Sequence, residues 1–192
     1  MMIGITGGTG AGKTTALDVL RELGALIIDC DRVYYELLNT DGDMKAELSD
    51  AFPEAFENGE LNRKKLGEKV FSDPDKLNEL NGIIYKYVMA RVMELASTAE
   101  ISAVDAISLI ESGLNKKCDC TVAVIAPRDE RVRRIMLRDG VSREYAEMRV
   151  AAQKPDDFYV EKCDYVLIND GDEEFFRQKC EMLFKNISGG KL

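Results

Sequence analysis

A glycine-rich run close to the N-terminus constrains this 192-residue chain more than any other feature. The run reads Gly7-Gly8-Thr9-Gly10-Ala11-Gly12-Lys13-Thr14, and it follows a short apolar segment, 2–6, and precedes apolar residues at helical spacing. Glycines at this spacing let successive backbone N–H groups turn toward phosphate oxygens, while the lysine can reach the β- and γ-phosphates. A strand before the run and a helix after it set the phosphate at a helix N-terminus, which argues against a chance glycine-rich turn. The run therefore predicts a phosphate-binding loop.

The loop indicates which residues bind the nucleotide and its metal ion. We expect ATP to be bound by Gly8, Thr9, Gly10, Ala11, Gly12, Lys13, Thr14 and Thr15. The hydroxyl of Thr14 can also ligate Mg²⁺. Asp105 stands near the end of a later apolar segment, where phosphate-loop enzymes often place an acidic residue that holds a Mg²⁺-bound water. An aspartate there can equally be a turn residue, so the sequence leaves both roles open for it.

Apolar segments recur along the chain and alternate with helical patterns. They span residues 2–6, 25–28, 103–107, 121–125 and 165–168. Strands that are apolar on both faces and separated by helices indicate a parallel sheet covered on both sides. We expect an α/β protein with the three-layer P-loop NTPase fold and a five-stranded parallel sheet, in a single domain over 1–192. A last helix over about 173–186 should bury Phe175, Phe176, Cys180, Leu183 and Phe184, and residues 188–192 should fray.

The segment from about 41 to 99 breaks this alternation, because it is polar, contains Pro53 and Pro74, and reads as several helices. Ligands of open α/β sheets lie beyond the carboxyl ends of the strands, so a helical insertion there can form a substrate-binding lobe. The alternative is a solvated helical hairpin that has no role in binding.

Carboxylates follow two of the expected strands. Asp29 and Asp31 come after the second one, beside the expected position of the loop. If the extended conformation continued, both would point to one side, and one could orient an acceptor hydroxyl while the other caps the next helix. In the other interpretation Asp31 only caps a helix over 33–38. Glu111 is either a substrate-binding residue or a solvated loop residue.

Three arginines at steps of three and four residues share one face of a helix expected over about 129–137: Arg131, Arg134 and Arg138. Either neighbouring acidic residues neutralise them on a solvated surface, or they close over a triphosphate as a lid. Guanidinium groups stabilise the charge that develops on a migrating phosphoryl group. We favour the lid for Arg138 and place this lid at about 138–153.

The composition limits the partners that the chain can have. A formal net charge of −9 argues against a nucleic-acid partner, because phosphate backbones are held mainly by lysine and arginine. No apolar run approaches the roughly 18 residues of a membrane span, and no signal peptide is visible, so we expect no membrane association and a cytoplasmic location. The chain has no histidine, so any acid–base chemistry falls to other side chains.

Several motifs together resemble the bacterial dephospho-coenzyme A kinases, in the nucleoside-monophosphate-kinase-like group of phosphate-loop kinases. They are Ile5 to Thr14, Ile28-Asp29-Cys30-Asp31, Gly59-Glu60-Leu61-Asn62-Arg63 with Val70-Phe71, Leu80-Asn81, Glu111, Arg134 to Arg138-Asp139, Arg149 with Gln153, and Asp164 to Asn169. The resemblance implies that the γ-phosphate of ATP is transferred to the 3′-hydroxyl of a small molecule, dephospho-CoA, giving CoA and ADP.

The resemblance also implies roles for individual residues. Asp31 corresponds to the general base, Lys13 and Arg138 to phosphate-stabilising groups, and Asn169 to a residue near the adenine. We expect Asp29, Arg63 and Glu111 to bind the substrate.

The chain departs from the family at two places. Tyr85-Lys86 stands where the family usually has His-Pro, and Ile107-Ser108-Leu109 where it usually has Pro-Leu-Leu. A cytidylate-like nucleoside monophosphate kinase and a nucleotide-binding module without acceptor chemistry therefore remain as alternatives. Arg63 and Arg91 are the only arginines between residues 41 and 99, which favours a hydroxyl acceptor over a phosphate.

Overall fold

The computed structural model of the protein describes residues 1–190, so the last two residues of the expected C-terminal tail lie outside it. Two compact units make up the chain. One unit, called the sheet unit here, contains Met1–Asp29 and the chain from Ala96 onward. The other, the helical unit, spans Cys30–Leu95.

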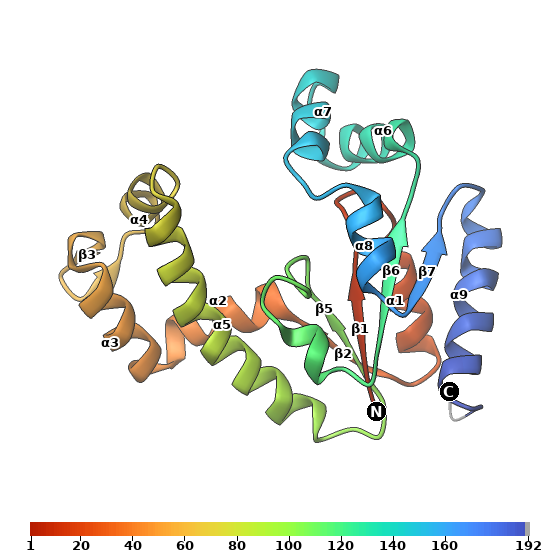
Figure 1. The fold of residues 1–192 in the computed structure, drawn as a ribbon, viewed down its shortest axis with the longest axis horizontal. Helices are drawn as coiled ribbons and strands as arrows, with labels where there is room; N and C mark the ends of the chain where they lie inside the picture. The colour runs from red at the N-terminus through yellow and green to blue at the C-terminus, as the bar shows by residue number, and fades with distance from the viewer. Residues whose placement is uncertain (191–192) are drawn as a thin grey trace. The chain divides into compact units, whose positions relative to one another are not determined.

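A five-stranded parallel sheet with strand order β2-β5-β1-β6-β7 forms the centre of the sheet unit (Figure 1). Its strands are β1 (Met2–Thr6), β2 (Leu26–Asp29), β5 (Ser102–Asp105), β6 (Cys120–Ile125) and β7 (Tyr165–Ile168). The pairing register sets Asp105 opposite both Ile5 and Asp29, so these three strands end at one edge. The five expected strands are all present, and the expected α/β fold with a parallel sheet is confirmed.

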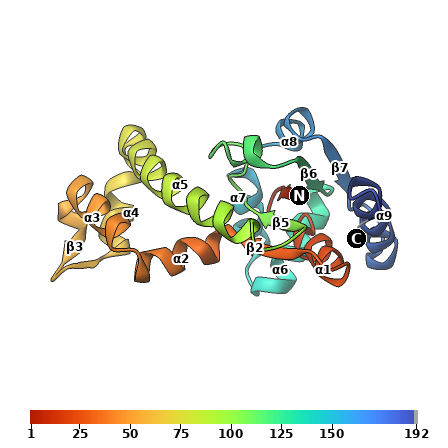
Figure 2. The ribbon, with the colours of Figure 1, turned by 90° about the horizontal axis from the view of Figure 1, so that it is seen from below.

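Layers cover both faces of this sheet (Figure 2). On one face lie α1 (Lys13–Glu22) and α9 (Glu173–Ile187), whose buried residues join Ile3 and Ile5 in one core cluster. On the other lie the short helix η2 (Leu114–Lys117) and α8 (Asp156–Lys162). The expectation for the last helix is wrong at Phe175, which is 51% exposed, whereas Phe176, Cys180 and Phe184 are buried.

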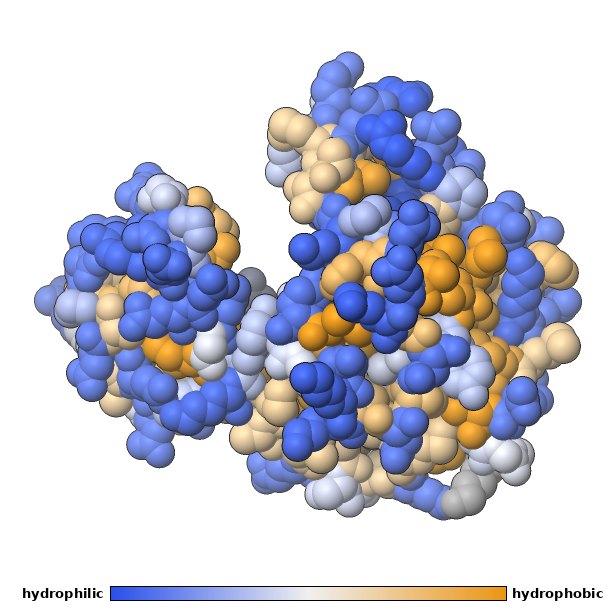
Figure 3. Space-filling view, viewed as in Figure 1, coloured by the Kyte–Doolittle hydropathy of each residue, from blue (hydrophilic) through white to orange (hydrophobic). Residues whose placement is uncertain are grey.

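Two consecutive helices follow the end of β6: α6 (Arg128–Asp139) and α7 (Arg143–Ala151). They pack through an apolar cluster of Val132, Ile135, Ala146 and Val150. Gly140 ends α6 in the left-handed conformation, at a φ of 66°. The outer surface of this helix pair, at the top of Figure 3, is largely hydrophilic. The pair contains most of the segment that the sequence predicts to be a lid.

The helical unit begins directly after β2. Its elements are α2 (Cys30–Thr40), α3 (Gly42–Ala51), the short helix η1 (Pro53–Ala55), the hairpin strands β3 (Phe56–Glu57) and β4 (Glu60–Leu61), α4 (Arg63–Val70) and α5 (Pro74–Ala96). Asp41 caps α3 and Asn62 caps α4, each through a side-chain oxygen that accepts from a backbone N–H in the first turn. Even α5, with 23 residues, lacks the apolar character needed to cross a membrane, and the same holds for every other helix within residues 1–190.

Candidate active site

The glycine-rich loop connects the end of β1 to the start of α1. Gly7, Gly10 and Gly12 have positive φ values of 135°, 80° and 107°, a conformation that side chains other than glycine rarely adopt. Lys13 is the first residue of α1, so the N–H groups of the first helical turn face the loop. This is the geometry of a phosphate-binding loop at a helix N-terminus.

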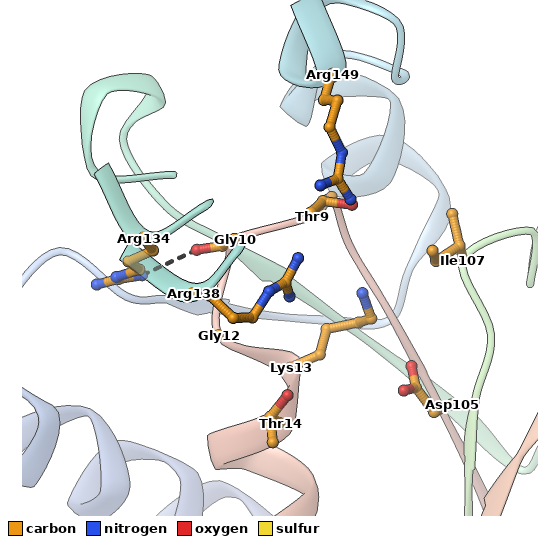
Figure 4. A pocket seen from close by; sticks show the side chains of 11 residues that line it. Thr9, Gly10, Gly12, Lys13, Thr14, Asp105, Ile107, Arg134, Arg138 and Arg149 are labelled. Carbon is orange, nitrogen blue, oxygen red and sulfur yellow. Dashed lines mark hydrogen bonds between the residues drawn. The ribbon is translucent and has the colours of Figure 1, made fainter. Parts of the chain in front are cut away.

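A cavity of about 420 Å³ opens over the loop (Figure 4). It is lined by Gly8, Thr9, Gly10, Gly12, Lys13, Thr14, Asp105, Ile107, Arg134, Arg138 and Arg149. The cavity thus brings most of the expected nucleotide-binding residues together with Asp105 and Arg138. In Figure 4 the charged ends of Lys13, Arg138 and Arg149 point into it from α1, α6 and α7. Such a concentration of cations over a phosphate loop suits a polyphosphate ligand.

Lys13 and Asp105 both line this cavity, from α1 and from the end of β5. The ammonium of Lys13 donates to the carbonyl oxygen of Gly7 at 3.0 Å, which holds the side chain along the loop. Asp105 ends β5, in register with Ile5 of β1, so its carboxylate lies at the carboxyl edge of the sheet. The exposed Thr14 lines the same cavity from α1. A hydroxyl and a carboxylate are the hard oxygen donors that Mg²⁺ prefers.

Arg138 and Arg149 share one carboxylate at the mouth of the cavity. Arg138 donates from Nε and Nη2 to the two oxygens of Asp139, at 2.7 and 3.0 Å, and Arg149 Nη1 donates to Asp139 at 2.5 Å. Hydrogen bonds from Arg138 and then Arg149 lower the pKa of Asp139 to about 2. Asp139 therefore stays ionised at physiological pH and keeps two guanidinium groups of like charge side by side.

The other two arginines of the set expected on one face, Arg131 and Arg134, contact the loop backbone. Arg131, expected on a solvated surface or over a triphosphate, is buried, and its Nε donates to the carbonyl oxygen of Thr9 at 3.1 Å. Arg134 Nη1 lies 3.3 Å from both the Gly10 and Ala11 carbonyl oxygens. Neither expectation describes Arg131, because its guanidinium is buried, donates to the Thr9 peptide oxygen and does not line the cavity.

Asn169, expected near the adenine, lies directly after β7 and is 5% exposed. Its side-chain amide donates to the Ala11 carbonyl oxygen at 2.9 Å and accepts from Arg134 Nη2 at 3.1 Å. A Cβ on Gly12 would lie 2.1 Å from this amide nitrogen. The asparagine therefore packs against the loop at a position where only glycine fits opposite it.

Asp29 and Asp31 fall on different elements. Asp29 ends β2, opposite Asp105, and is exposed. The extended conformation does not continue, since α2 begins at Cys30, so the expected common orientation of the two carboxylates is wrong. The helix also begins before Val33, which puts Asp31 inside its first turn and corrects the interpretation of Asp31 as a cap. Asp31 retains a favourable place there, because carboxylates stabilise helix N-termini.

The two remaining acceptor-side residues lie in different units. Arg63, in the helical unit, is the first residue of α4, and its guanidinium carbon lies 4.7 Å above the ring of Tyr35. Glu111, in the sheet unit, is exposed and lines a second cavity of about 370 Å³ with Ile107 and Tyr159.

Arg149 and Gln153 are points of the family resemblance, and both fall in the segment expected to be a lid. Arg149 lies on α7, whereas Gln153 lies two residues beyond the end of that helix, so the helical spacing of four residues does not explain how the pair is placed. No sequence pattern predicts the contact of Arg131 with Thr9, because 122 residues separate the two in the chain.

The parallel sheet, the loop at the N-terminus of α1 and the cationic cavity above it define a phosphate-loop protein of the kinase type. A solved structure titled dephospho-CoA kinase from Campylobacter jejuni has the same fold, with a TM-score of 0.71 and 24% identity over 100% of this chain and 98% of that one. A family model described as dephospho-CoA kinase matches residues 1–174, and the chain belongs to that family.

Individual relatives agree with this assignment. A protein named dephospho-CoA kinase from Thermus thermophilus is 34% identical over 192 residues, covering 99% of this chain and 93% of the relative. A crystal structure from Thermus thermophilus superposes with a TM-score of 0.81 at 33% identity, covering 97% of each chain. The expected family and the P-loop fold are therefore confirmed.

Proposed function

We propose that the protein phosphorylates the ribose 3′-hydroxyl of dephospho-CoA with ATP, releasing CoA and ADP. In this reaction a bond forms between the 3′-oxygen and the γ-phosphorus, the bond from that phosphorus to the β,γ-bridging oxygen breaks, and the hydroxyl proton leaves to a base. Family membership supports the acceptor. The observation that carries the chemistry is the cavity in which Lys13, Arg138 and Arg149 converge above the phosphate loop.

The loop and its surrounding cations supply phosphate binding and charge stabilisation. Backbone N–H groups of the loop and of the first turn of α1 hold the phosphates, with Lys13 beside the β- and γ-phosphates. Arg138 stabilises the charge that develops on the migrating phosphoryl group. Arg149, kept near it by Asp139, supports the same charge from α7. Closure of 138–153 over the nucleotide as a lid would complete this arrangement.

Thr14 and Asp105 suit a Mg²⁺ site, with the Thr14 hydroxyl as a direct ligand and the Asp105 carboxylate holding a metal-bound water. Both line the cavity and offer oxygen donors of the kind this ion prefers. A bound Mg²⁺ would neutralise phosphate charge on the nucleotide.

The residues on the acceptor side are proposed from the resemblance to the family. Asp31 is proposed as the base that orients or deprotonates the 3′-hydroxyl, with Asp29, Arg63 and Glu111 as acceptor contacts. The helical unit is proposed as the lobe that binds the acceptor. Between residues 41 and 99 this unit has only two arginines, and one of them, Arg91, pairs with Glu36 and Glu94. This pairing disfavours a phosphate acceptor and hence the nucleoside monophosphate kinase.

A panel of acceptors tests the proposal. The purified protein with Mg²⁺ and ATP is incubated with dephospho-CoA, CMP, AMP, shikimate or adenosine, and ADP release and the phosphorylated product are measured. We expect dephospho-CoA to be phosphorylated fastest, at the 3′-oxygen, and Lys13→Ala to abolish turnover while remaining folded. Faster ADP release with CMP or AMP would contradict the proposed acceptor, and unchanged turnover in folded Lys13→Ala would contradict the proposed kinase chemistry.

A further inference from the structure

Thr9, in the phosphate loop, is held by side chains from two distant parts of the sheet unit. Gln153 accepts from the Thr9 backbone N–H at 2.8 Å through Oε1 and donates to the Thr9 hydroxyl at 2.7 Å through Nε2. Arg131 donates to the Thr9 carbonyl oxygen at 3.1 Å. All three polar groups of Thr9 are therefore engaged by these two side chains.

Arg131 and Gln153 also bind one another, and the pair is anchored on a third residue. Arg131 Nη2 donates to Gln153 Oε1 at 2.6 Å, and Nη1 donates to Asp156 Oδ1 at 3.3 Å. The Arg131 side chain is only 5% exposed. Burying a guanidinium is costly unless its donors are satisfied, so the arginine is held in this one orientation.

The loop packs directly onto this guanidinium. A Cβ on Gly8 would lie 2.0 Å from Arg131 Nη2, so the loop approaches as closely as a glycine allows. In a planar trans peptide the C=O and N–H groups point in opposite directions. A hydrogen bond from Arg131 to the Thr9 oxygen therefore fixes the direction in which the N–H of Gly10 points.

We propose that Arg131 and Gln153 are positioning residues of the phosphate loop, which fix the Thr9–Gly10 peptide so that the Gly10 N–H is presented to a bound phosphate. This inference rests on the proposed function, in which ATP occupies the loop. It differs from the lid role expected for the α6 arginines, because Arg131 acts through the loop backbone and is not among the residues that line the cavity.

Gln153 also links the loop to the proposed lid. It lies two residues beyond the end of α7, and Arg149, on the last full turn of that helix, lines the cavity. A movement of α7 that carries Arg149 toward the phosphates must then act on Gln153 and, through it, on Thr9. Loop geometry and lid position are thereby coupled through one side-chain amide.

Substitution of Gln153 tests the inference. Gln153→Leu keeps the size of the side chain and removes its donor and its acceptor, whereas Gln153→Glu keeps an acceptor for the Thr9 N–H and for Arg131. We expect Gln153→Leu to raise the Kd for MgADP and the KM for ATP by about tenfold, the scale of one to two lost hydrogen bonds, with the KM for the acceptor unchanged. Gln153→Glu should recover most of the affinity. Gln178→Leu, at an exposed glutamine of α9, is the matched control and should bind MgADP as the wild type does.

Arg131→Met tests the same inference independently and should also weaken MgADP binding. Arg133→Met, on the exposed side of the same helix, is its control. If Arg131→Met fails to fold, Gln153→Leu decides the question. Calorimetric titration with MgADP and thermal unfolding are measured for every variant. A Gln153→Leu protein with a lowered Tm but wild-type affinity for MgADP would overturn the inference, because the contact would then serve stability alone.

The same titration separates the inference from the proposed function. If the wild type fails to bind MgADP, the proposed function is wrong and the inference falls with it. If the wild type binds MgADP but does not phosphorylate dephospho-CoA, only the acceptor is wrong, and the affinities of the Gln153 variants still decide the positioning role.

Discussion

Arg138 is the residue whose loss should affect catalysis most selectively. Its side chain is 58% exposed and pairs with the neighbouring Asp139, so it can turn toward a phosphoryl group without disturbing the core. We expect Arg138→Ala to lower kcat by about three orders of magnitude, the effect known for transition-state arginines, while MgADP binding stays measurable. Arg133→Ala, on the exposed side of α6 and paired with Glu130, is the control. Equal losses in both variants would show that the effect comes from the helix and not from the cavity.

Asp139 gives this site a defined pH dependence. Its pKa falls from 3.8 to about 2 because Arg138 and Arg149 donate to it. Ionised Asp139 stabilises the folded state above about pH 4, because its pKa is lower in the folded protein than in the unfolded chain. This stabilisation is lost as the pH falls through about 2. In carboxyl-detected NMR, Asp139 should remain ionised at the lowest pH at which the protein stays folded, and Arg138→Ala should raise its midpoint. A wild-type midpoint near 4 would contradict the ion-pair geometry.

At the residue scale, the sequence predicted which residues line the phosphate cavity better than it predicted where their side chains point. Lys13, Thr14, Asp105 and Arg138 do meet in one cavity, because strand ends and a helix N-terminus converge in a parallel sheet. The burial of Arg131 was missed, because a buried arginine depends on partners that only the folded chain supplies.

At the scale of elements, strands were predicted well because each is apolar on both faces and lies between helices. Strands β1 and β7 have the bounds that the sequence predicts, while β5 stops at Asp105, two residues before its expected end. The start of α2 was predicted three residues late. An aspartate shortly before an apolar run resembles a cap, whereas here the helix follows the strand with no linker at Cys30.

The α6–α7 pair is the element whose movement the proposed function requires. Its internal core is small, with four buried apolar residues, which favours local opening. We expect amide exchange across 138–153 to slow when MgADP is added, and to slow further when the acceptor is bound as well. The exchange of α9, far along the chain and packed on α1, serves as the internal reference. Equal protection of 138–153 with and without ligands would indicate a static helix pair and no lid.

At the scale of the whole molecule, the division into two units predicts a division of ligands. Every residue that lines the phosphate cavity belongs to the sheet unit, whereas Asp31 and Arg63 belong to the helical unit. MgADP alone should therefore slow amide exchange in the loop and in α6, and dephospho-CoA alone should slow it within α2 and α4.

Kinetics provide a second measurement of that division. We expect Arg63→Ala to raise the KM for dephospho-CoA and leave the KM for ATP unchanged, because Arg63 is exposed and lies over Tyr35, remote in sequence from the loop. Lys64→Ala, at the exposed neighbouring position of α4, is the control and should change neither constant. If dephospho-CoA is phosphorylated but protects nothing within Cys30–Leu95, the helical unit is not the acceptor lobe. Acceptor recognition would then have to come from the sheet unit, where Ile107 and Glu111 line the second cavity.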